Sequence, residues 1–177
     1  PYMKDTDGKD TNQSAYFSGT NRNKRSLTLD LSSEEGQSIA RELISKSDIL
    51  VENFKVGTLK KYNLDYESLK DQFPDLIYCS ITGFGQTGPY ASRPAYDALV
   101  QAMGGVMSLT GEPDGEPMKV GVSIADLMAG MYATVSILAA LRHRDKTNQG
   151  QHLDISMLDA HVAWLANQGM NYLATGS

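Results

Sequence analysis

Three short apolar runs separated by helical stretches limit the folds open to this chain. DILVEN (48–53) and HLDISM (152–157) flank LIYCSIT (76–82), the most uniformly apolar of the three. Each run has the length and side-chain content of a buried strand. Helical patterns lie between consecutive runs. Because strands that alternate with helices form a largely parallel sheet, we predict an α/β fold with flanking helices.

Helical periodicity and turn residues organise the rest of the chain. Ser33, which two glutamates follow, predicts the start of a helix. Residues 1–23 are polar and predict a loop or arm, whereas the alternating SLTLDL (26–31) predicts a further strand. Later helices are expected over 56–62, 65–73, 96–109, 123–144 and 158–173. The pattern over 123–144 is apolar on most faces, so we expect that helix to be buried.

The net charge narrows the classes of ligand. The 177 residues include 16 basic and 21 acidic side chains, which gives a formal net charge of −5. A nucleic-acid-binding domain is usually basic, so we expect no nucleic acid partner. An anionic ligand would have to meet local positive charge, for which the chain has two clusters: Arg22, Lys24 and Arg25, and Lys55, Lys60 and Lys61. These side chains are either merely solvated, or they hold phosphates beside a base stacked on Phe54 or Tyr62.

Several other classes of protein lack support in the sequence. The single cysteine, Cys79, excludes an internal disulfide and fits a buried hydrophobe in a reducing compartment, by default the cytoplasm. No apolar run approaches the roughly 18–20 residues of a membrane span, so we expect no membrane partner. His143, His152 and His161 lack ligand spacing, so we expect no metal site. The chain begins at Pro1 without a Met, which leaves a targeting segment open.

A glycine-rich loop follows the central apolar run. Residues 83–88 (GFGQTG) match G-x-G-x-x-G, the bare pattern of a dinucleotide-binding turn. That turn requires a helix to begin at the last glycine, but Pro89 and Pro94 follow closely and disfavour one. We therefore expect neither NAD nor FAD. The pattern instead predicts a connection whose backbone can approach a ligand closely.

Asp126 is the outstanding candidate for chemistry. It lies in GVSIADLMAG, among apolar neighbours near the start of the long expected helix. The helix dipole and the free N–H groups of a first turn favour a carboxylate there, so one interpretation is a structural role at the helix start. The other is a sheltered nucleophile that forms a covalent acyl intermediate. Chemistry alone favours the structural interpretation.

Six motifs occur in an order that resembles a known family. They are NRNKRSLTLDL, DILVENF, IYCSITGFGQTGP, AYDALVQAMGG, GVSIADLMAG and ALRHRDKTNQGQHLDISMLDA. Together they resemble the class III coenzyme A transferases, the CaiB/BaiF family, from Tyr16 onward. The resemblance implies a Rossmann-like large domain, a small domain and an interlocked homodimer. It identifies residues 1–177 as an incomplete N-terminal part of the large domain, without the small domain and the C-terminal part. We expect this piece alone to be inactive and to self-associate.

The resemblance assigns a reaction to Asp126. Its carboxylate attacks an acyl-CoA thioester to give a mixed anhydride, and CoA thiolate then forms an aspartyl-CoA thioester. An acceptor carboxylate enters and leaves as the new acyl-CoA. The implied substrates are an acyl-CoA and a small carboxylic acid, with no tightly bound cofactor. The chain is most similar to members that handle succinyl-CoA and dicarboxylic acids. Backbone N–H groups of residues 83–88 are candidates to stabilise the oxyanions.

The resemblance also implies which residues contact CoA. Asn53 and Phe54 match the motif that lies against the nucleotide. Lys61 matches a basic position that meets a CoA phosphate, and Leu29 matches a residue that lines the adenine pocket. Arg25 belongs to the basic run of the first motif. These assignments follow from the family pattern alone.

Tyr96 separates two activities within the family. Racemases, which invert the α-carbon of 2-methylacyl-CoA, have a histidine base at this position and pair it with the aspartate that corresponds to Asp126. Transferases commonly have tyrosine, as this chain does. A CoA-transferase is therefore the first hypothesis and an α-methylacyl-CoA racemase or epimerase the second. A non-catalytic CoA-binding scaffold is the third. The structural alternative for Tyr96 is an aromatic that packs at a helix start.

Overall fold

The computed structural model describes residues 2–176, and the chain divides into two units, residues 1–30 and residues 31–177. In the first unit, β1 (Tyr2–Lys4) pairs antiparallel with β2 (Asp10–Ser14), and the short helix α1 (Ala15–Thr20) follows at once. The Ser14 hydroxyl accepts a hydrogen bond from the Phe17 N–H and caps this helix. The loop predicted over 1–23 is therefore wrong for most of that range.

The segment that follows α1 lacks regular structure. Residues 24–30 form neither strand nor helix, so the strand predicted over 26–31 is wrong. An alternating apolar pattern becomes a strand only where a neighbouring strand pairs with its N–H and C=O groups. Within residues 2–176, no strand pairs with this segment. The alternating pattern is present over 26–31, but no strand among the described residues pairs with it.

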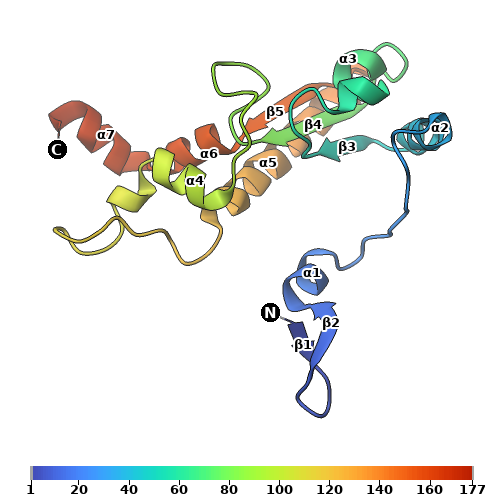
Figure 1. Ribbon diagram of the computed structural model, residues 1–177. Helices are drawn as coiled ribbons and strands as arrows, with labels where there is room; N and C mark the ends of the chain where they lie inside the picture. The colour runs from blue at the N-terminus through green and yellow to red at the C-terminus, as the bar shows by residue number, and fades with distance from the viewer. Residues whose placement is uncertain (1, 177) are drawn as a thin grey trace. The chain divides into compact units, whose positions relative to one another are not determined.

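The second unit is built on a three-stranded parallel sheet (Figure 1). Its strands are β3 (Ile49–Glu52), β4 (Ile77–Thr82) and β5 (His152–Ser156), in the order β3-β4-β5. The register pairs Leu50 with Tyr78 and Tyr78 with His152. The strands predicted over 48–53, 76–82 and 152–157 and the α/β class are confirmed. The central strand β4 is buried at every position except Ile81, as its largely apolar sequence predicted.

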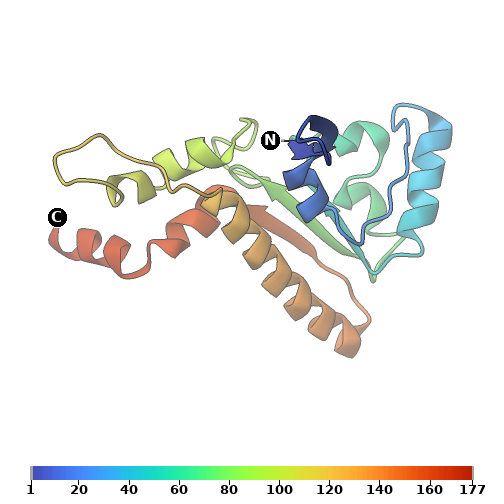
Figure 2. The same cartoon turned by 90° about the horizontal axis from the view of Figure 1, so that it is seen from below.

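Helices cover both faces of this sheet. On one face, Tyr78 packs in a core with α2 (Glu34–Ile44), the 3₁₀ helix η1 (Leu59–Tyr62) and α3 (Tyr66–Leu69). The α2 N-cap is Ser33, whose hydroxyl accepts from the Gly36 N–H, so the predicted helix start is confirmed. On the opposite face, Ile81 and Ile155 pack against α5 (Ile124–Thr147), which runs along β4 and β5 (Figure 2).

Two predicted helices are each interrupted. The helix expected over 96–109 forms as α4 (Asp97–Met103) and the 3₁₀ helix η2 (Val106–Ser108), separated at Gly105, whose φ of 90° is left-handed. The helix expected over 158–173 forms as α6 (Met157–Trp164) and α7 (Ala166–Thr175). There the chain turns at Ala166, which has a φ of 47°. Helical periodicity continued across both breaks, so it concealed them.

The long helix α5 is less buried than its sequence suggested. It buries only small side chains, at Ala125, Ala129, Ala133 and Ala140, because these let it approach the sheet and α6 closely. Exposed apolar side chains follow the rest of its length: Leu127, Met131, Tyr132, Val135 and Leu138. The prediction of a buried helix is therefore wrong for the described chain. Apolar character on most faces indicates burial only when every face has a neighbour.

The expectation that no apolar run is long enough to span a membrane does not hold for α5. By length and composition α5 could cross a membrane, since an 18-residue window has a mean hydropathy of 1.7, with 22% of that window buried. Core helices of globular proteins pass the same test, so this finding by itself assigns no location.

Gly150 fixes the connection between α5 and β5, and its replacement tests the packing. Its N–H donates to the Pro74 carbonyl at 2.8 Å, and an added Cβ would lie 2.0 Å from the Leu76 carbonyl oxygen. We expect Gly150→Ala to lower the free energy of unfolding by about 1–3 kcal/mol, measured by urea denaturation, since backbone must move. Gly130→Ala on α5 is the control, because nothing lies within 4 Å of its added Cβ. Equal stabilities of the two variants would contradict this account.

Candidate active site

The functional residues expected from the sequence converge on one edge of the parallel sheet. All three strands end at this edge, where Asn53 follows β3 and Thr82 is the last residue of β4. The helix α5 returns from this edge to the start of β5, so its first turn, with Asp126, lies there too. We call it the carboxyl edge. Ligands of open α/β sheets bind outside the carboxyl ends of the strands.

A hollow at the carboxyl edge brings three of the predicted residues together. Asn53, Phe54 and Tyr96 line this first hollow, which has a volume of about 240 Å³. The Asn53 amide donates to the Ile81 carbonyl at 2.6 Å, so the segment after β3 is tied to β4. Tyr96 precedes α4 and is 80% exposed, which leaves its ring and hydroxyl accessible.

The first turn of α5 is held by hydrogen bonds from α4. The Asp97 carboxylate accepts from the Ala125 N–H at 2.8 Å and from the Gln101 amide at 2.7 Å. Gln101 is fully buried, and its side-chain oxygen accepts from the Val120 N–H at 2.8 Å. Asp126 is the next residue after Ala125. The two α4 side chains therefore fix the backbone that carries Asp126, although Asp126 itself is not among the residues that line the hollow.

The carboxylate of Asp126 is perturbed in the direction expected for a sheltered site. Desolvation by neighbouring protein atoms, and secondly the negative charge of Asp97, raise its pKa above the usual aspartate value. The residue is nevertheless exposed in this chain, so a reacting molecule can reach it. Perturbed pKa values gather at functional sites, so the raised pKa supports a chemical role for this carboxylate.

The remaining predicted contacts do not join this hollow. Lys61 is exposed on η1 and lines neither of the two hollows described here, whereas Lys55 lines both. Lys60, next to the predicted residue, lines the second hollow. Arg25 and Leu29 belong to the first unit, where Arg25 is exposed and Leu29 half-buried.

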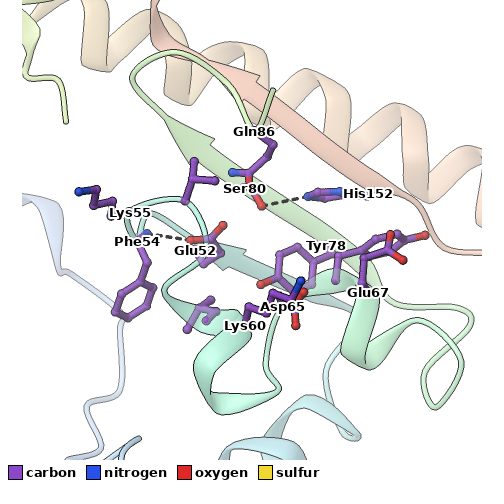
Figure 3. A pocket seen from close by; sticks show the side chains of 14 residues that line it. Glu52, Phe54, Lys55, Lys60, Asp65, Glu67, Tyr78, Ser80, Gln86 and His152 are labelled. Atoms are coloured by element: carbon purple, nitrogen blue, oxygen red, sulfur yellow. Dashed lines mark hydrogen bonds between the residues drawn. The ribbon is translucent and has the colours of Figure 1, made fainter. Parts of the chain in front are cut away.

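The second hollow lies on the face of the sheet that α3 covers, with a volume of about 220 Å³ (Figure 3). The Ser80 hydroxyl and the His152 Nε2 atom are 3.0 Å apart. Tyr66 stacks on the His152 ring at a centroid distance of 4.6 Å, and Tyr78 meets it edge-on at 5.4 Å. Burial lowers the pKa of His152 below that of a free histidine. This cluster holds β4, β5 and α3 together.

The glycine-rich loop forms no dinucleotide-binding turn. No helix begins after Gly88, as predicted, and the loop turns instead at Gly85, whose φ is 81°. The Gln86 N–H donates to the Asp154 carboxylate at 2.9 Å. The Gln86 N–H already donates to a carboxylate, so it is poorly suited to stabilise an oxyanion.

Cys79 is buried at the centre of the sheet, as predicted. Its side chain is 0% exposed, and burial raises its pKa to about 11. A thiol in that environment stays protonated and unreactive.

Comparison with known proteins decides the family. The model of CoA-transferase family III matches residues 2–177. The chain belongs to this family. The succinate–glutarate CoA-transferase of Agrobacterium fabrum is 52% identical over 176 residues, which are 99% of this chain and 44% of that relative. The human succinyl-CoA:glutarate CoA-transferase is 40% identical over 161 residues, or 91% and 37% of the two chains.

Solved structures agree with this family III assignment and with the α/β fold. A CaiB/BaiF family protein from Brucella suis has a TM-score of 0.92 and 52% identity, covering 100% of this chain and 46% of that one. Rv3272 from Mycobacterium tuberculosis has a TM-score of 0.80 and 33% identity, covering 87% and 44%. The chain thus spans less than half the length of these relatives. The resemblance seen in the six motifs is confirmed.

Sequence reasoning missed several residues that line or support the two hollows. Asp97 and Gln101 left a visible signal, because aspartate and glutamine four residues apart on a helix form hydrogen bonds. Ser80 and His152 left none, since only the register of β4 against β5 brings them together. Arg93 also lines the first hollow, and the sequence of the glycine-rich loop did not predict that this residue returns to the carboxyl edge.

Gln101 offers a test of how α4 supports the α5 first turn. Gln101→Met keeps the side-chain volume but removes one of the two hydrogen bonds to the Asp97 carboxylate and leaves the Val120 N–H without its partner. We expect the free energy of unfolding to fall by about 1–3 kcal/mol, because buried polar groups lose their hydrogen bonds. Gln149→Met, at an exposed glutamine, should leave the denaturation curve unchanged. An unchanged curve for both variants would disprove the role of Gln101.

The lowered pKa of His152 predicts that the stability of the fold depends on pH. Its folded pKa lies below the unfolded value, so the unfolded chain takes up the proton first as the pH falls. The contribution of neutral His152 is complete above about pH 6.5 and is lost as the pH falls from there toward the folded pKa. We expect His152→Gln to lose less unfolding free energy than the parent between pH 7 and pH 5. His143→Gln, on the exposed part of α5, should retain the parental slope, and a parental slope in both would contradict the assignment.

Proposed function

We propose that the complete gene product transfers CoA from an acyl-CoA to a free carboxylic acid through a covalent intermediate on Asp126. The observation that supports this most is the position of Asp126 in the first turn of α5, at the carboxyl edge of the sheet. Relatives in family III are named as CoA-transferases. The interlocked homodimer implied by the family pattern stays a prediction.

The proposed reaction conserves the thioester through two anhydrides. An Asp126 oxygen attacks the thioester carbonyl carbon and CoA thiolate leaves, giving a mixed anhydride. The thiolate then attacks the Asp126 carbonyl carbon, which releases the donor acid and leaves an aspartyl-CoA thioester. The acceptor carboxylate attacks the aspartyl carbonyl carbon and expels the thiolate, which gives a second mixed anhydride. The thiolate then attacks the acceptor carbonyl carbon, forms the new acyl-CoA and releases the Asp126 carboxylate. Each step exchanges one acyl bond for another and needs no external reductant or oxidant.

The surroundings of Asp126 suit a nucleophile. A poorly solvated carboxylate is more reactive than one surrounded by water, and the raised pKa reflects such partial desolvation. The hydrogen bonds from Asp97 and Gln101 fix the backbone, so little reorganisation is needed at attack. Tyr96, where family racemases have a histidine base, favours transfer over inversion.

We infer that the substrates are dicarboxylic. Relatives are named for succinate and glutarate, and for succinyl-CoA and mesaconate, all of which have a second carboxylate. Succinyl-CoA is the donor to test first.

Chemical trapping tests the covalent intermediate. The complete gene product, incubated with succinyl-CoA and then hydroxylamine, should yield a hydroxamate on the peptide that contains Asp126, identified by mass spectrometry. Asp126→Asn should abolish both the adduct and CoA transfer. Asp145→Asn, at an exposed acid near the other end of α5, is the control and should leave both intact. Exchange of the α-proton of a 2-methylacyl-CoA without any adduct would instead support the racemase.

Stability separates a chemical role of Asp126 from a structural one. Because its pKa is raised in the folded state, the ionised form disfavours folding above the folded pKa, and this cost disappears below the unfolded pKa. Asp126→Asn removes the charge, so we expect a melting temperature at pH 7 equal to or above that of the parent. A large loss of melting temperature would mean that the inactive variant is merely unfolded.

A further inference from the structure

We propose that His161 is a positioning residue for the transfer reaction: its imidazole packs against Gly104 and fixes α4, and α4 in turn holds the first turn of α5 through Asp97. The inference rests on the proposed function for the reaction that Asp126 performs. The effect of His161 on α4 follows from packing, so it can be measured without any substrate.

His161 is buried on α6, a helix that packs against both α4 and α5. Its side chain is 0% exposed, and the ring of Trp164, further along the same helix, lies at a centroid distance of 6.1 Å. Neither Nδ1 nor Nε2 has a hydrogen-bond partner among residues 2–176. Within the described chain the imidazole is therefore held by packing, and an unpaired buried group of this kind calls for an explanation beyond packing.

Gly104 makes room for the imidazole. It is the residue at which α4 ends, and its N–H donates to the Val100 carbonyl at 2.8 Å. A Cβ added to Gly104 would lie 2.4 Å from the Cδ2 atom of His161, which is closer than side chains pack. Only glycine therefore lets the end of α4 approach the His161 ring this closely.

One face of α4 connects His161 with the first turn of α5. Asp97 and Gly104 are seven residues apart, which is about two helical turns, so they lie on the same face. At one end of this face Gly104 contacts the His161 ring, and at the other the Asp97 carboxylate accepts from the Ala125 N–H at 2.8 Å. A shift of α4 at Gly104 therefore reaches the backbone that carries Asp126.

The charge of the imidazole decides whether Asp97 stays in place. Burial lowers the pKa of His161 below that of a free histidine, and the negative charge of Asp97 opposes this effect. At pH 7 the ring is neutral and leaves the Asp97 carboxylate to the Ala125 N–H and the Gln101 amide. A buried imidazolium would attract that carboxylate instead. Protonation of His161 therefore loosens the first turn of α5.

Asp97 is the charged group that matters to this imidazole. It is the one charged side chain of α4, and α7 has none. The other charged or titratable groups on elements packed against His161 are Asp126 and residues 142–146 on α5, His152 and Asp154 on β5, and Asp159 on α6 itself. Among the described residues, only Asp97 shifts the pKa of His161 through its charge.

Hydrogen exchange of the complete gene product tests the positioning without substrate. Mass spectrometry follows the peptide that contains the Ala125 N–H at pH 7 in the parent, in His161→Ala and in Gly104→Ala. We expect this amide to exchange about tenfold faster or more in both variants, because α4 shifts when the ring is removed or displaced. Gly130→Ala, whose added Cβ has nothing within 4 Å, should exchange like the parent. Parental exchange in both test variants would overturn the proposal.

Kinetics connect the positioning with the reaction. We expect kcat for CoA transfer to fall about tenfold or more in His161→Ala and Gly104→Ala, since a small misplacement of the attacking group slows the reaction. KM for succinyl-CoA should stay within about twofold of the parental value, because no residue that lines the first hollow is changed. A raised KM with an unchanged kcat would refute a positioning role.

The pH profile gives a signature that a purely structural role lacks. His161→Gln has nearly the same volume but gains no proton, so its kcat at pH 7 should be close to the parental value. In the parent we expect kcat to fall as the pH drops below about 6.5, whereas His161→Gln should keep its kcat until Asp126 is protonated. His143→Gln, at an exposed histidine on α5, is the matched control and should keep the parental profile. A parental profile in His161→Gln would contradict the proposal.

The two kinds of measurement keep the proposal separate from the proposed function. A parent that transfers no CoA, but whose Ala125 amide loses protection in the variants, would refute the transferase and keep the effect of His161 on α4. A parent that transfers CoA, with parental exchange and kinetics in every variant, would do the reverse. If His161→Ala does not fold, Gly104→Ala carries both measurements, since it displaces the ring without removing it.

Discussion

The parallel pairing of β4 between β3 and β5 is the constraint on which this structure depends. Because the three strands run in one direction, every connection between them must cross a face of the sheet, and helices make those crossings. One crossing places α3 over Tyr78, and the other places α5 over Ile81. The same pairing gathers all strand ends on one edge. The site follows from strand direction before any individual side chain is considered.

The site itself depends on buried polar bonds more than on apolar packing. Gln101 and Asp97 connect α4 to the segment that leads into α5, and each makes at least two hydrogen bonds in doing so. Such bonds contribute modestly when formed and cost more when one partner is removed. They therefore define position more sharply than an apolar contact would. Because Asp126 directly follows Ala125, the hydrogen bond at Ala125 also positions the backbone of Asp126, while the Asp126 side chain can still react.

The sequence predicted what local chemistry determines and missed what distant contacts determine. Ser33 caps a helix through its own hydroxyl, and LIYCSIT is buried because most of its side chains are apolar, so both features could be predicted from the sequence. SLTLDL alternates equally well but has no partner strand among the described residues, and the sequence of this segment alone cannot show that. The pair Ser80 and His152 depends on register across the sheet. In the site, Asp126, Asn53 and the Tyr96 hollow came from motifs that resemble a family, and Arg93 came only from the path of the loop.

The register of the sheet also has a consequence for the order in which the chain can fold. β3 and β4 are close in sequence, so their pairing closes a short loop, but Tyr78 meets His152 only after α4 and α5 have been made. A chain synthesised from its N-terminus thus completes the apolar helix α5 before the strand that anchors it exists. During that interval β4 has one open edge, and α5 can pack against β4 but not yet against β5. The arrival of β5 is the event that commits both to the native arrangement.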